Sequence, residues 1–225
     1  MGFLKSRLPK AVIFDMDGLL LDSERLHLVC FETSMNELGY EPDLTIYRQC
    51  VGATGRQSSL ILSKSYGSEF PVDRVKSRWS QLYRRMIQEG HLKLKPGAQK
   101  LLEYLQGDFL CALATSTSRE LAEKKLSMLG LLEYFDFSVT GDDVSHGKPD
   151  PEPYVKASTG LNVDSVDCWA LEDSENGVRS AVGAGCQVIQ IPDLIRPSEE
   201  LRSLGHLVVE SLDDVRELLQ SIEKH

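Results

Sequence analysis

The sequence predicts an α/β protein, in which a doubly wound parallel sheet is covered by helices and a helical bundle is inserted after the first strand. Short apolar runs alternate with segments of helical periodicity, as they do where crossover helices join parallel strands. Acidic or hydroxyl residues directly follow several of these runs. The stretch 21–92 interrupts this alternation of strands and helices, because it has helical periodicity without a convincing buried strand.

The expected strands are the apolar runs at residues 11–14, 110–114, 137–139, 166–171 and 188–191. Helical patterns lie between them, for example at residues 120–129 and 174–184. In the stretch 21–92, apolar residues recur at helical spacing, as at Trp79, Leu82 and Met86. Pro96 and Gly97 favour a turn, which marks the point where the chain returns to the sheet domain. We therefore expect a core domain of residues 1–20 and 93–225, and a helical domain of residues 21–92.

Composition and charge narrow the class of partner. The 225 residues carry a formal net charge of -9, which argues against nucleic acid and anionic membranes as partners. No apolar stretch approaches the roughly 20 residues of a membrane-spanning helix. The five scattered cysteines form no CxxC pair, which favours a reducing, cytoplasmic compartment over a disulfide framework or a zinc site. A small-molecule partner is the remaining expectation, and a chain of this size is expected to work as a monomer.

Polar residues follow the ends of four expected strands. Asp15 and Asp17 follow the first, Thr115, Ser116 and Thr117 the second, Lys148 the third, and Glu172 and Asp173 the fourth. Ligands of parallel α/β sheets bind at the carboxyl ends of the strands, so these side chains are expected to meet there.

These residue types suit phosphoryl transfer. Carboxylate oxygens are the ligands that Mg²⁺ prefers, and a cation together with a lysine neutralises a phosphate. A carboxylate can then attack phosphorus and form an aspartyl phosphate, which water hydrolyses in a second step. A neighbouring carboxyl can protonate the leaving group and later activate the water. We assign Asp15 as the nucleophile and Asp17 as the general acid and base.

Four segments carry a family resemblance, at residues 14–24 (FDMDGLLLDSE), 112–116 (ALATS), 147–151 (GKPDP) and 171–177 (LEDSENG). In this order they resemble the motifs of the haloacid dehalogenase (HAD) superfamily, in particular its β-phosphoglucomutase-like and pseudouridine-5′-phosphatase-like phosphatases. The resemblance covers most of the chain. It implies a Rossmann-like core and a mobile helical cap, formed by the insert, that closes over the substrate.

The resemblance also implies roles for individual residues. Asp15 would be nucleophile and metal ligand, and Asp17 would be the acid and base and bind the metal through its backbone carbonyl. Thr115 would bind the transferred phosphoryl group, and Lys148 would stabilise nucleophile and phosphate. Asp173, helped by Glu172, would hold Mg²⁺. We also assign Ser116, beside Thr115, to substrate binding.

Two residues of the insert resemble substrate-contacting positions of the family. Arg56 matches a cap arginine that contacts the distal group of the substrate in the mutases, and His27 matches a hinge histidine. The cap lysine of the mutase falls at Trp79, which favours hydrolysis over phosphoryl return.

The leading hypothesis is a Mg²⁺-dependent phosphatase acting on a sugar phosphate or a nucleotide-derived monoester. A phosphomutase using the same aspartyl phosphate is the nearest alternative. A phosphoacceptor receiver domain is an alternative of a different class, since receivers also combine Asp, Mg²⁺, Thr and Lys. The second acid, the motif order and the insert argue against a receiver. The sequence leaves the physiological substrate open.

Overall fold

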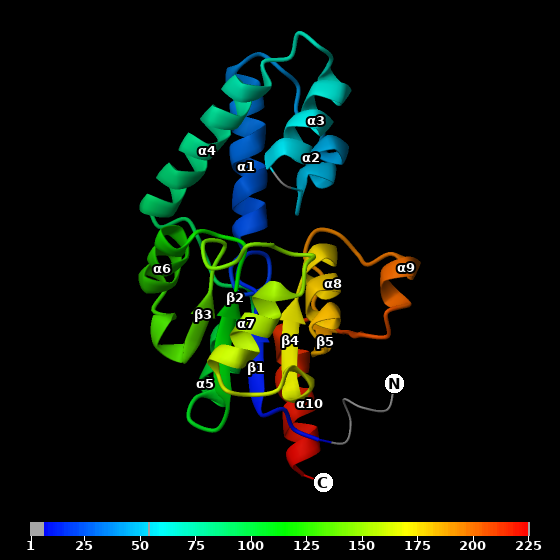
Figure 1. Ribbon diagram of the computed structural model, residues 1–225. Coiled ribbons are helices and arrows are strands. Elements are labelled where there is room, and N and C mark those ends of the chain that lie inside the picture. The colour runs from blue at the N-terminus through cyan, green and yellow to red at the C-terminus, as the bar shows by residue number, and fades with distance from the viewer. Residues whose placement is uncertain (1–6, 54, 225) are drawn as a thin grey trace. The chain divides into compact units, whose positions relative to one another are not determined.

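The computed structural model describes residues 7–53 and 55–224, which form two compact units (Figure 1). The first unit comprises the described residues up to Leu21 and from Leu94 onward, and we call it the core. The second unit is Asp22–Lys93, and we call it the insert. The expected helical domain, 21–92, differs from the insert by one residue at each end.

The core is built on one parallel sheet of six strands in the order β3-β2-β1-β4-β5-β6. The strands are β1 (Ala11–Phe14), β2 (Leu110–Ala114), β3 (Phe137–Val139), β4 (Cys168–Glu172), β5 (Gln187–Gln190) and β6 (Leu207–Val208). Every residue of β1 and β4 is buried, as expected where helices cover both faces of a parallel sheet. The predicted doubly wound α/β fold is confirmed.

The strand order reverses at β1. The chain goes from β1 to β2 on one side and reaches β4 on the other, and Phe14 pairs with both Leu113 and Leu171. Such a reversal leaves a crevice at the carboxyl ends of the two strands, where ligands of doubly wound folds bind. Asp15 and Glu172 therefore lie at the topological switch point of this sheet.

Helices cover the two faces of the sheet. These helices are α5 (Ala98–Leu105), α6 (Arg119–Met128), α7 (Glu152–Gly160), α8 (Glu175–Gly183), α9 (Glu199–Arg202) and α10 (Leu212–Glu223). On one face, α7 and α8 pack on small strand residues such as Ala112 and Ala170. In Figure 1 they lie in front of the sheet and α10 lies behind it, where it packs on α5.

The insert consists of α1 (Ser23–Glu37), α2 (Leu44–Cys50), α3 (Gly55–Tyr66) and α4 (Val72–Gln88). Its centre is aromatic, because Trp79 on α4 lies against Phe31 on α1 and Tyr47 on α2, with ring centroids 5.1 and 5.8 Å away. Among the residues that the structure describes, no helix has the length and apolar character needed to span a membrane.

Several strand bounds differ from the sequence-based expectation. Strand β5 lies one residue earlier than the expected 188–191, and β4 ends at Glu172, one residue later than expected. The strand expected at 166–171 starts only at Cys168, because Ser165–Asp167 form a 3₁₀ turn that leaves Val166 exposed. The short edge strand β6 was not predicted, since two half-buried residues give no periodic signal. The helices expected at 120–129 and 174–184 are α6 and α8, each ending within one residue of the expected bounds.

Candidate active site

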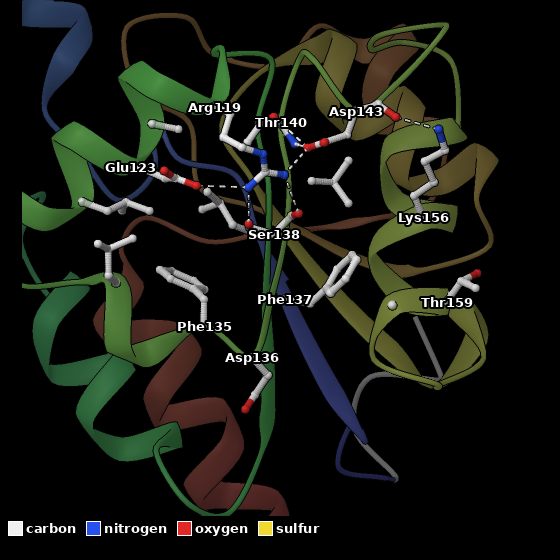
Figure 2. Close-up of a pocket in the computed structure, with 16 residues that line it drawn as sticks. Arg119, Glu123, Phe135, Asp136, Phe137, Ser138, Thr140, Asp143, Lys156 and Thr159 are labelled. Atoms are coloured by element: carbon white, nitrogen blue, oxygen red, sulfur yellow. Dashed lines mark hydrogen bonds and ion pairs between the residues drawn. The ribbon is translucent and has the colours of Figure 1, made fainter.

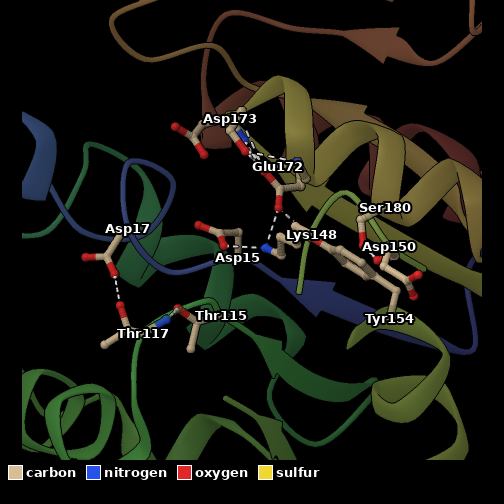
Figure 3. Close-up of polar contacts among 12 residues, drawn as sticks. Asp15, Asp17, Thr115, Thr117, Lys148, Asp150, Tyr154, Glu172, Asp173 and Ser180 are labelled. Carbon is tan, nitrogen blue, oxygen red and sulfur yellow. Dashed lines mark hydrogen bonds and ion pairs between the residues drawn. The ribbon is translucent and has the colours of Figure 1, made fainter. Parts of the chain in front are cut away.

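The polar residues predicted to follow the strands gather at the carboxyl edge of the sheet (Figure 3). Asp15 directly follows β1, and its backbone N–H donates to the carbonyl of Leu171 on β4 at 3.0 Å. Thr115 directly follows β2 and donates its N–H to Val139 on β3 at 2.9 Å. Glu172 is the last residue of β4. Backbone pairing between neighbouring strands thus fixes where each of these side chains starts.

Lys148 joins two of the carboxylates. Its Nζ lies 2.5 Å from Oδ1 of Asp15 and 2.5 Å from Oε1 of Glu172. The Lys148 side chain is only 5% exposed and that of Glu172 is fully buried, so water screens these charges little. The site therefore has a buried ammonium shared by two buried carboxylates.

The Glu172 carboxylate is held by further donors. Its Oε1 also accepts from the hydroxyl of Tyr154 at 2.7 Å. Its Oε2 accepts from the backbone N–H groups of Asp173 and Ser174 and from the Ser174 hydroxyl. Gly177 leaves the space that this carboxylate fills, because a Cβ at position 177 would collide with it. Hydrogen bonds and packing together fix the orientation of Glu172.

Burial governs the ionisation of the Asp15–Lys148 pair. It raises the pKa of the Asp15 carboxyl from the ordinary 3.8 to about 7, against the opposing attraction of the Lys148 ammonium. Burial alone would lower the pKa of Lys148, but the carboxylates of Asp15 and Glu172 together raise it above its ordinary value. Lys148 therefore remains an ammonium at neutral pH, while Asp15 titrates near neutrality in the metal-free protein.

Asp17 has a different set of partners. Its Oδ2 accepts from the hydroxyl of Thr117 at 2.7 Å, and its Oδ1 lies 2.6 Å from Nζ of Lys125 on α6. In Figure 3 the Asp17 carboxylate points toward Thr117 and away from Asp15. The two aspartates of the first motif thus contact different lysines.

The loop after β2 is tightly packed. Thr115 is buried, and its hydroxyl oxygen accepts from the backbone N–H of Thr117 at 3.1 Å. Ser116 is exposed, and Gly141 approaches its backbone carbonyl so closely that a Cβ would collide with it. The predicted phosphoryl-binding Thr115 and the predicted substrate-binding Ser116 therefore lie on a tightly packed loop.

Three carboxylates fit a cation. Ligand oxygens of Asp15, Glu172 and Asp173 all lie within 4.8 Å of one another, and oxygen donors of this kind suit Mg²⁺. Gly18, in the loop after Asp17, abuts the Asp173 carboxylate, since a Cβ at position 18 would collide with Oδ2. The first motif and the end of β4 therefore meet at this cluster.

Comparison with known proteins identifies the family. A family model described as haloacid dehalogenase-like hydrolase matches residues 12–191. The chain belongs to the haloacid dehalogenase-like hydrolase family. The resemblance predicted from the four motifs is confirmed, and this HAD chain is a phosphoric monoester hydrolase.

Several relatives match over nearly their whole length. A phosphorylated carbohydrates phosphatase from Thermotoga maritima is 33% identical over 94% of this chain and 91% of the relative. A probable pseudouridine-5′-phosphatase from Drosophila melanogaster is 33% identical over 91% of this chain and 90% of the relative. The crystal structure of CbbY from Rhodobacter sphaeroides with phosphate is 28% identical, covers 92% of this chain and 96% of its own, and has a TM-score of 0.73.

The other two predicted substrate-binding residues of this HAD chain belong to the insert. His27 on α1 stacks on Tyr83 of α4, with ring centroids 3.6 Å apart, and its ring lies 5.9 Å from that of Trp79. Arg56 is exposed in the first turn of α3. Their contact with a substrate stays a prediction.

Sequence reasoning missed two residues that contact the HAD motifs, namely Lys125 and Tyr154. It placed Thr117 after the second strand but gave it no role, whereas the structure shows its hydroxyl donating to Asp17. Lys125 left a signal, since it interrupts the apolar stripe of α6 formed by Ala122 and Leu126. Tyr154 gave no such signal, because a hydroxyl partner of this kind is set by tertiary packing.

A separate hollow of about 800 Å³ lies at the edge strand β3 (Figure 2). Arg119 lies within it and contacts Glu123, Ser138 and Asp143. None of the predicted site residues lines this hollow. Because the motif residues lie elsewhere, we assign the hollow no role in the HAD chemistry.

Proposed function

We propose that this chain is a Mg²⁺-dependent phosphatase that hydrolyses a small phosphorylated metabolite through an aspartyl phosphate on Asp15. One observation carries the proposal: the Lys148 ammonium, 2.5 Å from both Asp15 and Glu172, places a buried cation beside the nucleophile at the switch point of the sheet. A phosphate needs such local cations in a chain with a net charge of -9.

In the first step an Asp15 oxygen attacks phosphorus, and the bond between phosphorus and the leaving oxygen breaks. The new bond is an acyl phosphate, and the leaving oxygen takes a proton from Asp17 and departs as an alcohol. The Lys148 ammonium attracts the phosphoryl oxygens, while Thr115 and Ser116 hold the transferred group.

In the second step Asp17 removes a proton from water, and the water oxygen attacks phosphorus. The bond between phosphorus and Asp15 breaks, which releases inorganic phosphate and restores the Asp15 carboxylate. Asp17 then holds the proton that it needs for the next leaving group. Atoms and protons therefore balance over one cycle without a further reactant.

Asp15, Asp173 and Glu172 would hold Mg²⁺ through their carboxylates, and Asp17 through its backbone carbonyl as the family resemblance implies. The clustered oxygens support this assignment. When bound, the ion neutralises negative charge on the phosphate and on the carboxylates.

We propose a sugar phosphate or a nucleotide-derived monoester as the substrate class. The names of the two relatives, a phosphorylated carbohydrates phosphatase and a probable pseudouridine-5′-phosphatase, support it. We further propose that His27 and Arg56 of the insert contact the part of the substrate beyond the phosphate. Trp79, at the position of the mutase lysine, supports hydrolysis over phosphoryl return.

We also propose a cytoplasmic enzyme that acts as a monomer. All five cysteines are buried and unpaired, which suits a reducing compartment. The proposed catalytic groups come from strand ends and loops of a single chain, so no second copy is needed to complete them.

The test is phosphate release from a panel of monoesters that includes hexose 1- and 6-phosphates and pseudouridine 5′-phosphate, with Mg²⁺ or with chelator. We expect release that requires Mg²⁺ and is lost in Asp15→Asn. Conversion of β-glucose 1-phosphate to glucose 6-phosphate without phosphate release would instead establish the mutase. No turnover of either kind would refute the proposed function.

A further inference from the structure

Lys125 is a buried ammonium that the proposed reaction does not yet use. The residue is 1% exposed, and its Nζ lies 2.6 Å from Oδ1 of Asp17 across 108 positions of sequence. Its neighbours on the same face of α6, Ala122 and Leu126, are apolar and buried. The helix therefore carries a charge where its apolar stripe meets the loop after β1.

Stability alone does not favour a lysine at this position. A buried ion pair contributes little, because the desolvation of both charges offsets their attraction, and apolar residues of similar volume often serve as well. A methionine at position 125 would continue the apolar stripe that packs α6 on the core. The lysine thus calls for a reason connected with its partner, Asp17.

The contacts of Asp17 restrict how its carboxylate can turn. Lys125 binds one oxygen and Thr117 binds the other, at 2.6 and 2.7 Å. Two donors on different oxygens fix both the direction of the side chain and the plane of the carboxylate. Asp15, in contrast, contacts Lys148, whose Nζ lies 2.5 Å from its Oδ1. Each aspartate of the first motif has a lysine of its own.

We propose that Lys125 is a positioning residue, which together with Thr117 fixes the orientation of the Asp17 carboxylate for proton transfer. The inference rests on the proposed function, in which Asp17 is the general acid and base. In this proposal Lys125 acts through Asp17 and contacts neither the nucleophile nor the phosphate.

The effect of a misplaced acid depends on the leaving group. An alkoxide must be protonated as it departs, whereas 4-nitrophenolate is stable without a proton. The parameter to compare is kcat/KM, because it reports the steps up to formation of the aspartyl phosphate. Loss of Lys125 should therefore affect an alkyl monoester much more than 4-nitrophenyl phosphate.

The test compares Lys125→Met with Lys124→Met, which removes the exposed lysine next to it on α6. For an alkyl monoester that the wild type hydrolyses, we expect Lys125→Met to lower kcat/KM by about 10- to 100-fold. For 4-nitrophenyl phosphate we expect a loss below about fivefold, and for Lys124→Met no loss with either ester. Lys125→Arg should recover part of the loss.

A double-mutant cycle distinguishes an effect of Lys125 on the Asp17 carboxylate from a general structural effect of the substitution. In an Asp17→Asn background, Lys125→Met should cause no further loss, because the group that it positions is gone. Thr117→Val, which removes the other donor, should show the same preference for the nitrophenyl ester and serves if Lys125→Met does not fold. Equal losses on both esters that persist in Asp17→Asn, or no loss at all, would overturn the inference. A wild-type protein that is inactive on every ester would instead refute the proposed phosphatase function.

Discussion

The hydroxyl of Tyr154 donates a 2.7 Å hydrogen bond to Oε1 of Glu172, the same oxygen that accepts from Lys148. Tyr154 is fully buried on α7, and its ring lies 5.1 Å from the Lys148 ammonium. Helix α7 thereby helps to fix the acceptor that holds the lysine beside Asp15.

Tyr154→Phe should slow the reaction while the fold is retained. The substitution keeps the ring and removes one donor to a buried carboxylate, at a cost of about 1 to 3 kcal/mol in the free energy of unfolding. We expect kcat to fall by about 3- to 30-fold as Lys148 and Glu172 lose their fixed geometry. Tyr104→Phe is the control, because it removes a surface hydrogen bond to Glu223 and should leave kcat unchanged. Equal kcat in the two variants would show that the Tyr154 contact is irrelevant to catalysis.

Gly177→Ala should destabilise the core, because its methyl group would collide with the buried Glu172 carboxylate. Overpacking of this kind costs about 1 to 3 kcal/mol in the free energy of unfolding. Gly183→Ala, on the same helix α8, adds a methyl group in ordinary contact with Pro151 and should be neutral or slightly stabilising. Denaturant unfolding measures both. Similar stabilities of the two variants would contradict the tight fit around Glu172.

Gly18→Ala should weaken Mg²⁺ binding. Its methyl group would push on the Asp173 carboxylate, and its φ of +86° disfavours any side chain. Gly39→Ala is the matched control, since Gly39 has a φ of +80° but no neighbour within 4 Å. We expect the Mg²⁺ concentration for half-maximal activity to rise by about 10- to 100-fold in Gly18→Ala only. An equal rise in both variants would assign the effect to backbone strain.

Mg²⁺ binding should be linked to a proton. In the metal-free protein burial raises the pKa of Asp15 to about 7, so below that pH the carboxyl carries a proton that the cation must displace. The apparent dissociation constant should therefore increase by about tenfold for each pH unit below 7 and level off above it. Calorimetric titration in buffers of different ionisation enthalpy measures the released proton. A constant affinity from about pH 5.5 to about pH 8 would refute the linkage, and Asp15→Asn should show that constancy.

The sequence predicts the residues at strand ends better than their partners. Asp15, Thr115 and Asp173 directly follow short buried strands, and Glu172 is the last residue of one. Pairing of parallel strands brings such residues to one edge of the sheet. The positions of these residues can be predicted from local sequence patterns and the topology of the fold alone.

The partners of these residues depend on packing between distant elements. Lys125 reaches Asp17 from α6, and Tyr154 reaches Glu172 from α7. No spacing in the sequence encodes how deep a helix packs or which rotamer a buried side chain adopts. Only the interruption of an apolar stripe by a charge, as at Lys125, marks such a residue in advance.

Trapping the covalent intermediate shows whether Asp15 is the nucleophile. The enzyme would be mixed with a radiolabelled phosphate ester and Mg²⁺, quenched in acid within the first turnover, and digested for mass spectrometry. We expect a hydroxylamine-sensitive label on the peptide that contains Asp15, absent in Asp15→Asn. Phosphate release by the wild type with no label at Asp15, or with label on another residue, would refute Asp15 as the nucleophile.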